Sequence, residues 1–261
     1  MWIAYVVTSQ DRLEDGSFNK LIKSLESQSC PVRIIVGLRG CALPPEYAGK
    51  IHSSITLPFR ISLSSARNRL LAHEPSNLGD WICFPDDDCW YPKDLLLKVN
   101  SELKNFDFLV GVIDTGQKKI HKFFKSEPYV KIGLQEALKH TASAALFLDA
   151  EAMRGFVFDE RLGLGAQVGS AEDLDLTLYL LSKGSRGLFS KDILVKHPFK
   201  PNRERDYFEG SIAALSKYYR SIRFARFSAF RRTIKGILLF ASGKLSSSQL
   251  KRTFFYLLNR W

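Results

Sequence analysis

The chain has 261 residues and a mass of 29.7 kDa, with 45% hydrophobic and 25% charged residues, which excludes wholesale disorder and a fibrous repeat. Its four cysteines form no C-x-x-C pair, so the sequence predicts neither a zinc knuckle nor a disulfide scaffold and favours a reducing cytoplasm. The first residues do not resemble a signal peptide, and no run of about 18 apolar residues predicts a transmembrane helix.

The net charge of +11 is unevenly distributed along the chain. Residues 1–199 contain 24 Lys and Arg and 24 Asp and Glu, whereas residues 200–261 contain 14 and 3. An enzyme that acts on nucleic acid more often spreads its basic charge around the site, so nucleic acid is not a favoured partner. The distribution predicts a neutral body followed by a basic tail.

The first 115 residues alternate between apolar, β-rich runs and segments with helical spacing. Strands are predicted over 3–7, 32–38, 51–57 and 81–84, and helices over 17–28, 62–73 and 92–103. The β-α-β unit in the first forty residues favours a parallel sheet with a right-handed crossover. The sequence therefore predicts an α/β fold.

The pattern is less regular from residue 108 onward. Strands are predicted over 108–113, 119–125, 142–148 and 193–195, with a helix over 171–183. Four glycines between residues 155 and 170 predict a mobile loop before that helix.

Three consecutive carboxylates, Asp86, Asp87 and Asp88, follow the strand predicted over 81–84. In extended backbone, Asp86 and Asp88 point to one side and Asp87 to the other. Two crowded carboxylates repel each other unless a cation lies between them, and a hard divalent ion with oxygen ligands fits such a pair. The alternative is a solvated acidic turn that caps the next helix. The position at the end of a strand, where ligands gather in α/β sheets, favours a functional site.

A second acidic pair, Glu172 and Asp173, begins the helix predicted over 171–183. The helix dipole keeps a carboxylate ionised there, which suits a general base, although ordinary helix N-terminal charge is an alternative interpretation. His197 follows the last predicted strand. A lone histidine is more often a packed or surface residue than a ligand.

The tail carries apolar residues at helical spacing with basic residues between them. One stripe comprises Phe227, Phe230, Ile234, Ile237 and Leu238, and a second segment covers 247–261. Basic amphipathic helices with aromatic residues fit an anchor that lies on an anionic membrane surface. The alternative is that both helices pack on the body and expose their charges.

Residues 1–198 resemble the family 2 glycosyltransferases with the GT-A fold. The motifs occur in the family's order: IAYVVTSQDR with FNKLIKSLESQ, SLSSARNRLL, WICFPDDDCWYP, and FVFDERLGLGAQVGSAEDLDLTLYLLSKG. The resemblance implies a Rossmann-like mixed sheet flanked by helices. It also implies a catalytic domain over 1–199, with a nucleotide-sugar half over 1–115 and an acceptor half over 116–199, followed by the basic helical tail over 200–261.

The resemblance assigns the donor nucleotide-sugar to matched positions. Thr8 and Ser9 would lie beside the nucleotide, and Arg67 would approach its base or phosphates. Asp86 would belong to the Asp-x-Asp pair, and Asp87 would also contact the donor. The family usually has acidic residues after the second strand that help to hold the nucleoside. This sequence has Gly37-Leu38-Arg39-Gly40 instead, so the uridine contact from that position is absent.

The resemblance also assigns the metal and the base. Asp86 and Asp88 would hold Mn2+ or Mg2+ against the donor diphosphate, with His197 completing the ligand set. Asp173, or Glu172 as the close alternative, would deprotonate the acceptor hydroxyl, and this single displacement inverts the anomeric configuration.

We therefore expect a metal-dependent inverting glycosyltransferase that uses a nucleotide-sugar, with a UDP-sugar favoured. Its acceptor would be a glycan or a lipid-linked glycan of a surface polysaccharide, on the cytoplasmic face of the cell membrane. A nucleotidyltransferase and an inactive GT-A-like binding protein are the alternative functions.

Overall fold

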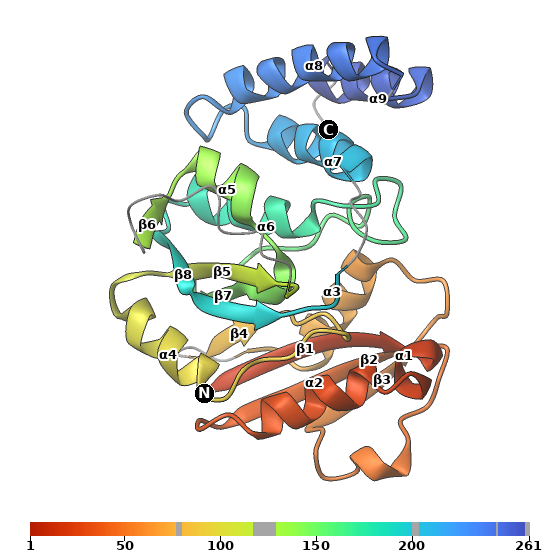
Figure 1. Cartoon of the computed structure of the whole chain (residues 1–261), viewed down its shortest axis with the longest axis vertical. Coiled ribbons are helices and arrows are strands. Elements are labelled where there is room, and N and C mark those ends of the chain that lie inside the picture. The colour runs from red at the N-terminus through yellow and green to blue at the C-terminus, as the bar shows by residue number, and fades with distance from the viewer. Residues whose placement is uncertain (77–79, 117–128, 200–203, 244, 259–261) are drawn as a thin grey trace.

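A computed structural model describes residues 1–76, 80–116, 129–199, 204–243 and 245–258 of the protein (Figure 1). The strands are β1 (Trp2–Ser9), β2 (Val32–Arg39), β3 (Ser53–Leu57), β4 (Trp81–Cys83), β5 (Phe108–Asp114), β6 (Tyr129–Ile132), β7 (Leu146–Asp149) and β8 (Gly187–Lys196). They form one 8-stranded sheet in the order β3-β2-β1-β4-β7-β5-β8-β6.

The sheet is mixed, as the sequence predicted. β1 is parallel to β2 and β4, and β2 is parallel to β3. β7 is antiparallel to both β4 and β5, β5 is parallel to β8, and β6 is antiparallel to β8. The chain moves outward from β1 to β3 and then returns to place β4 on the other side of β1. The carboxyl ends of β1 and β4 therefore flank a topological switch point, where α/β proteins bind their ligands.

Helices cover both faces of this sheet. They are α1 (Gln10–Glu14), α2 (Ser17–Glu26), α3 (Leu63–His73), α4 (Leu95–Glu102), α5 (Leu134–His140), α6 (Glu172–Ser182), α7 (Glu204–Lys217), α8 (Ala225–Ala241) and α9 (Ser247–Leu258), with 3-10 turns η1 (Pro45–Tyr47), η2 (Leu103–Asn105) and η4 (Ser143–Ala145). Side-chain alternation along β1 divides the core. Tyr5 and Val7 pack with α3 and α6 on one face, and Ala4 and Val6 pack with α2 and α4 on the other.

Two local expectations differ from the structure, and a third cannot be compared with it. The helix predicted over 92–103 begins only at Leu95, because the chain turns at Asp94, which has a φ of 63°. The strand predicted over 142–148 begins with η4, whose Ser143 carbonyl accepts the Leu146 N–H, so β7 starts at Leu146. The strand predicted over 119–125 lies outside the described residues.

The C-terminal segment is helical, and part of it belongs to the main core. Ile212, Ala214 and Leu215 of α7 are fully buried, and α7 packs against α6. The division of the chain at residue 199 and the two halves of the body stay predictions, and this apolar core crosses position 199. Among the described helices, none has the length and apolar character needed to cross a membrane. Figure 1 shows α8 and α9 at one end of the long axis, beyond α7.

Candidate active site

A cavity of about 470 Å³ opens at the carboxyl ends of β1 and β4, the position that the topology favours for a ligand. Its walls come from both ends of the chain, because α7 reaches back over the body. The polar residues that line it include Arg12, Arg39, Arg67, Asp86, Asp87, Ser143, Ser170, Glu172, Asp173, His197 and Tyr207. The cavity thus collects most of the site residues that the sequence predicted.

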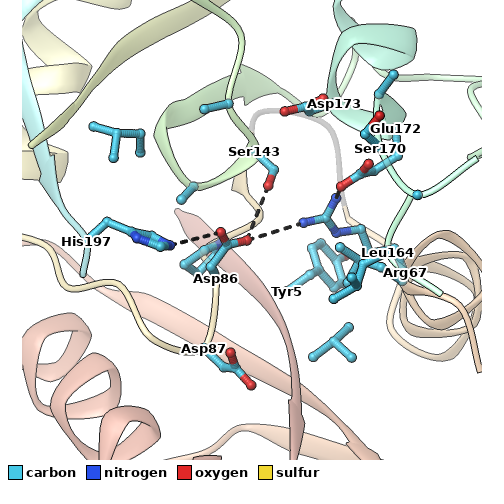
Figure 2. A pocket seen from close by; sticks show the side chains of 18 of the residues that line it. Tyr5, Arg67, Asp86, Asp87, Ser143, Leu164, Ser170, Glu172, Asp173 and His197 are labelled. Carbon is cyan, nitrogen blue, oxygen red and sulfur yellow. Dashed lines mark hydrogen bonds and ion pairs between the residues drawn. The ribbon is translucent and has the colours of Figure 1, made fainter. Parts of the chain in front are cut away.

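Asp86, Asp88 and His197 converge beyond the end of β4. The Nε2 atom of His197 lies 3.1 Å from Asp88 Oδ1 and 3.4 Å from Asp86 Oδ2. Burial alone would lower the pKa of His197, but hydrogen bonds to the two carboxylates outweigh it and raise the pKa to about 9. Figure 2 shows His197, Ser143 and Arg67 directed at Asp86 from three sides.

Arg12 fixes the other side of the aspartate triplet. Its Nη2 atom donates to Asp88 Oδ2 at 2.9 Å, and its Nε atom lies 3.7 Å from Asp87 Oδ1. Burial raises the pKa of Asp87 to about 6 against the opposing charge of Arg12. Asp87 points away from Asp86 (Figure 2). The backbone here is a turn, in which the Cys89 N–H donates to the Asp86 carbonyl at 3.1 Å, and not the extended chain assumed from the sequence.

Arg67 occupies the centre of the cavity wall. It projects from α3, which Ser62 caps by accepting the N–H of Ser65. The guanidinium is 2% exposed and lies against two aromatic rings, with its Cζ atom 5.3 Å from the Phe84 centroid and 5.5 Å from the Phe158 centroid. This packing fixes a permanent positive charge between the two groups of carboxylates.

Arg67 contacts both acidic groups. Its Nη1 atom lies 3.5 Å from Glu172 Oε1, and its Nη2 atom lies 4.0 Å from Asp86 Oδ1. The cation therefore offsets part of the repulsion between the triplet and the acidic pair of α6.

The N-terminus of α6 carries the acidic pair, in which Glu172 is buried and Asp173 is half-buried. Burial raises the pKa of Glu172, opposed by Arg67, and burial together with the charge of Glu172 raises the pKa of Asp173 to about 7. Asp173 Oδ1 accepts the N–H of Leu174 at 2.7 Å, which fixes the orientation of the side chain at the cavity wall. A carboxylate with a pKa near neutrality suits a group that accepts a proton.

The loop before α6 is closely packed. Gly163 has a φ of 98°, and a Cβ atom there would lie 2.9 Å from Ser64 Oγ and 3.2 Å from Glu172 Oε2. Ala171 has a φ of 74°, an unfavourable conformation for a residue with a side chain. Such strained backbone is typical of sites whose geometry is fixed by their surroundings.

No family model matches this sequence, and no curated protein matches it. Among solved structures, S. aureus TarS 1–349 in complex with UDP-GlcNAc is similar, with a TM-score of 0.64 and 16% identity over 85% of this chain and 67% of that one. The mannosyltransferase PcManGT from Pyrobaculum calidifontis, in complex with GDP-Man and Mn2+, has a TM-score of 0.61 and 11% identity over 98% of this chain and 73% of that one. The chain has the GT-A glycosyltransferase fold.

The resemblance stated from the GT-A motifs is thus confirmed at the level of the fold. The chain spans 40% of a longer structure of TarS.

Within the GT-A fold, the residues that could hold a divalent ion are Asp86, Asp88 and His197. One ligand atom from each lies within 4.8 Å of the others. Two carboxylate oxygens and an imidazole nitrogen suit Mn2+, and Mg2+ would rely more on the carboxylates and water. The donor set therefore fits the predicted cofactor.

Thr8 and Ser9 do not line the cavity. Thr8 is fully buried, because the alternation of β1 turns it to the same face as Ala4 and Val6. Tyr5 and Val7 line the cavity in their place. Because side chains alternate between the two faces of a strand, the sequence of β1 could have identified Tyr5 and Val7 as cavity residues.

Sequence reasoning also missed Arg12, Arg39, Ser143 and Tyr207 as cavity residues. Arg39 ends β2 at the position where the resemblance implied acidic residues, and its buried Nε atom has no hydrogen-bond partner. The cavity wall at the end of β2 thus carries a positive charge, where the family usually has acidic residues.

Proposed function

We propose that the protein is a metal-dependent, inverting glycosyltransferase that moves a sugar from a nucleotide-sugar to an acceptor hydroxyl. The observation that supports this is that one cavity is lined by Asp173 and by Asp86 and His197, which form the candidate ion cluster together with the buried Asp88 behind the wall. Arg67 lies between the two. The similar structures solved with UDP-GlcNAc and with GDP-Man and Mn2+ agree with this chemistry.

The donor would bind with its diphosphate at the cluster. Asp86, Asp88 and His197 would hold Mn2+ or Mg2+, which supplies Lewis-acid stabilisation of the charge that grows on the leaving diphosphate. Arg12 orients Asp88 through its hydrogen bond, and Ser143 donates to Asp86 at 3.3 Å. Both contacts hold the carboxylates in place before the donor arrives.

Asp173 would act as the general base. Both members of the acidic pair line the cavity, but Glu172 is paired with Arg67, whereas Asp173 has the pKa of about 7. In its ionised form Asp173 would accept the proton of the acceptor hydroxyl while the oxygen attacks the anomeric carbon. The carbon–oxygen bond to the diphosphate breaks in the same step, so the anomeric configuration inverts.

We propose the donor nucleotide, the acceptor and the membrane association from the resemblance to family 2 glycosyltransferases and from the charge distribution. The donor would be a UDP-sugar, and the acceptor would be a glycan or lipid-linked glycan of a surface polysaccharide. Residues 200–261 would hold the protein on the anionic cytoplasmic face of the cell membrane.

The test is incubation with UDP- and GDP-sugars and Mn2+, with the released product identified by chromatography. Release of the nucleoside diphosphate, lost in Asp173→Asn, supports the proposal. Release of pyrophosphate from a nucleoside triphosphate and a sugar phosphate would instead indicate a nucleotidyltransferase. Donor binding with no turnover, with a panel of lipid-linked acceptors present, would indicate an inactive binding protein.

A further inference from the structure

The outer face of α8 is formed by large apolar side chains. Phe227, Phe230 and Leu238 are 58%, 55% and 66% exposed, and Ile234 and Ile237 are exposed with them. These are the residues of the stripe predicted from the sequence. A stripe that packed on the body would be buried. α8 therefore does not pack on the body through this apolar stripe.

The inner face of α8 explains this orientation. It consists of small residues, among them Ala225, Ala229 and Gly236, which are buried. A Cβ atom at Gly236 would lie 2.5 Å from the ring of Phe208 in α7, so only glycine permits this close approach. The helix is therefore held by its small side, and its aromatic side remains turned away from the body.

α9 also exposes large apolar side chains. Phe255 is 57% exposed and Leu258 is 77% exposed, whereas Thr253 and Tyr256 are buried against the body. α8 and α9 contact each other, and both pack on α7 (Figure 1). We call six of the exposed apolar residues of these two helices, Phe227, Phe230, Ile234, Leu238, Phe255 and Leu258, the outer face.

The charged residues within α8 and α9 are all basic. Arg223, Arg226, Arg231, Lys235 and Lys251 are exposed on or beside the two helices. No Asp or Glu follows Glu209 in the chain. Aromatic side chains surrounded by basic groups suit an interface that offers both apolar tails and anionic headgroups.

We infer that the outer face docks on an anionic phospholipid bilayer, with Phe227, Phe230 and Leu238 entering the headgroup region. This inference rests on the proposed membrane association of residues 200–261. It makes that proposal more specific, because it names α8 and α9 as the contact and excludes the buried residues of α7. Tyr207 of α7 lines the active-site cavity, and α7 also supports the docking helices. The docking helices are therefore connected to the cavity through α7.

The test is flotation of the full chain with phosphatidylcholine vesicles, with and without 30% phosphatidylglycerol. Wild type is expected to float with the anionic vesicles and to be released by 1 M salt. Phe227→Ser with Leu238→Ser should lower the partition coefficient by about tenfold or more, since two large apolar side chains are removed from the contact with lipid. The matched control is Leu97→Ser with Val157→Ser, which replaces two equally exposed apolar residues outside the tail and should leave partition unchanged.

Equal flotation of the two double variants would overturn the inference, as would wild type that does not bind anionic vesicles. If wild type forms a dimer in light scattering and Phe227→Ser with Leu238→Ser does not, the outer face is a dimer interface and not a membrane contact. Binding to RNA in place of vesicles would also overturn it. Nucleotide-sugar turnover with a soluble acceptor, measured on the same variants, separates these outcomes from failure of the proposed enzymatic function.

Discussion

The Nζ atom of Lys217 lies 2.6 Å from Asp175 Oδ2 and 3.2 Å from Asp159 Oδ2. Lys217 ends α7, Asp175 lies in the first turn of α6, and the Tyr218 hydroxyl donates to Asp175 Oδ1 at 3.0 Å. This buried cluster fastens the C-terminal helices to the helix that carries Asp173. The C-terminal helices are thus linked through this cluster to the helix of the proposed base.

Lys217→Met should destabilise the protein by about 3 kcal/mol, because it leaves the side chain of Asp175 buried without its cation. Urea unfolding measures this. Lys139→Met, an exposed lysine on α5, is the control and should cost less than about 0.5 kcal/mol. Adding Asp175→Asn to Lys217→Met should restore part of the lost stability. If the two lysine variants unfold alike, the cluster does not hold α6.

Asp173→Asn should lower kcat by about 10²- to 10⁴-fold, with little change in donor binding, because the amide cannot accept a proton. In wild type, kcat/KM should rise with pH to a plateau, with an apparent pKa of about 7, since Asp173 must be ionised to act. Steady-state assays between pH 5.5 and 9 give both results. A profile that is flat through neutral pH, or a variant that retains full activity, would assign the base to another residue.

The same substitution should stabilise the protein at neutral pH. The folded-state pKa of Asp173 is raised from 3.8 to about 7, so stability is lost as the pH rises through this window and the buried carboxyl ionises. Asn does not ionise, so the free energy of unfolding of the variant should exceed that of wild type by on the order of 2 kcal/mol at pH 8 and by less at pH 5. Urea unfolding in EDTA at the two pH values tests this. A gain that does not depend on pH would contradict the argument.

His197→Ala should remove most of the thermal stabilisation that Mn2+ and a nucleoside diphosphate give together. The variant deletes one ligand of the candidate ion site and leaves the Arg12–Asp88 pair intact. A ligand present at 100 times its Kd raises stability by about 2.7 kcal/mol, which corresponds to several degrees in Tm. His52→Ala, at an exposed histidine, is the control. An unchanged Mn2+ response in His197→Ala would exclude His197 as a ligand.

Local pattern was enough to predict most strands and helices, because period 2 and period 3.6 are properties of short segments. It also placed Asp86, Asp88 and His197 near strand ends that meet at one edge of the sheet. The pairing of Arg12 with Asp88 spans 76 positions, and nothing in either segment indicates it. A contact between residues so far apart in the sequence depends on how whole helices and strands pack together, which short sequence patterns do not determine.

The orientation of α8 shows a second limit. Its apolar stripe was evident from spacing, but spacing cannot say whether an apolar face turns toward the body or away from it. The deciding feature is the opposite face, where Gly236 allows the ring of Phe208 to approach. Similarly, the resemblance implied that Thr8 lies beside the nucleotide, yet strand alternation buries it and leaves Val7 at the cavity.

The most direct test is calorimetric titration of UDP- and GDP-sugars into the protein, with and without Mn2+, for wild type and Asp86→Ala. Our account predicts that one nucleotide-sugar binds wild type in the presence of Mn2+, and that both EDTA and Asp86→Ala abolish binding. Absence of nucleotide binding under every metal condition, or equal binding by Asp86→Ala, would contradict a metal-dependent donor site in this cavity.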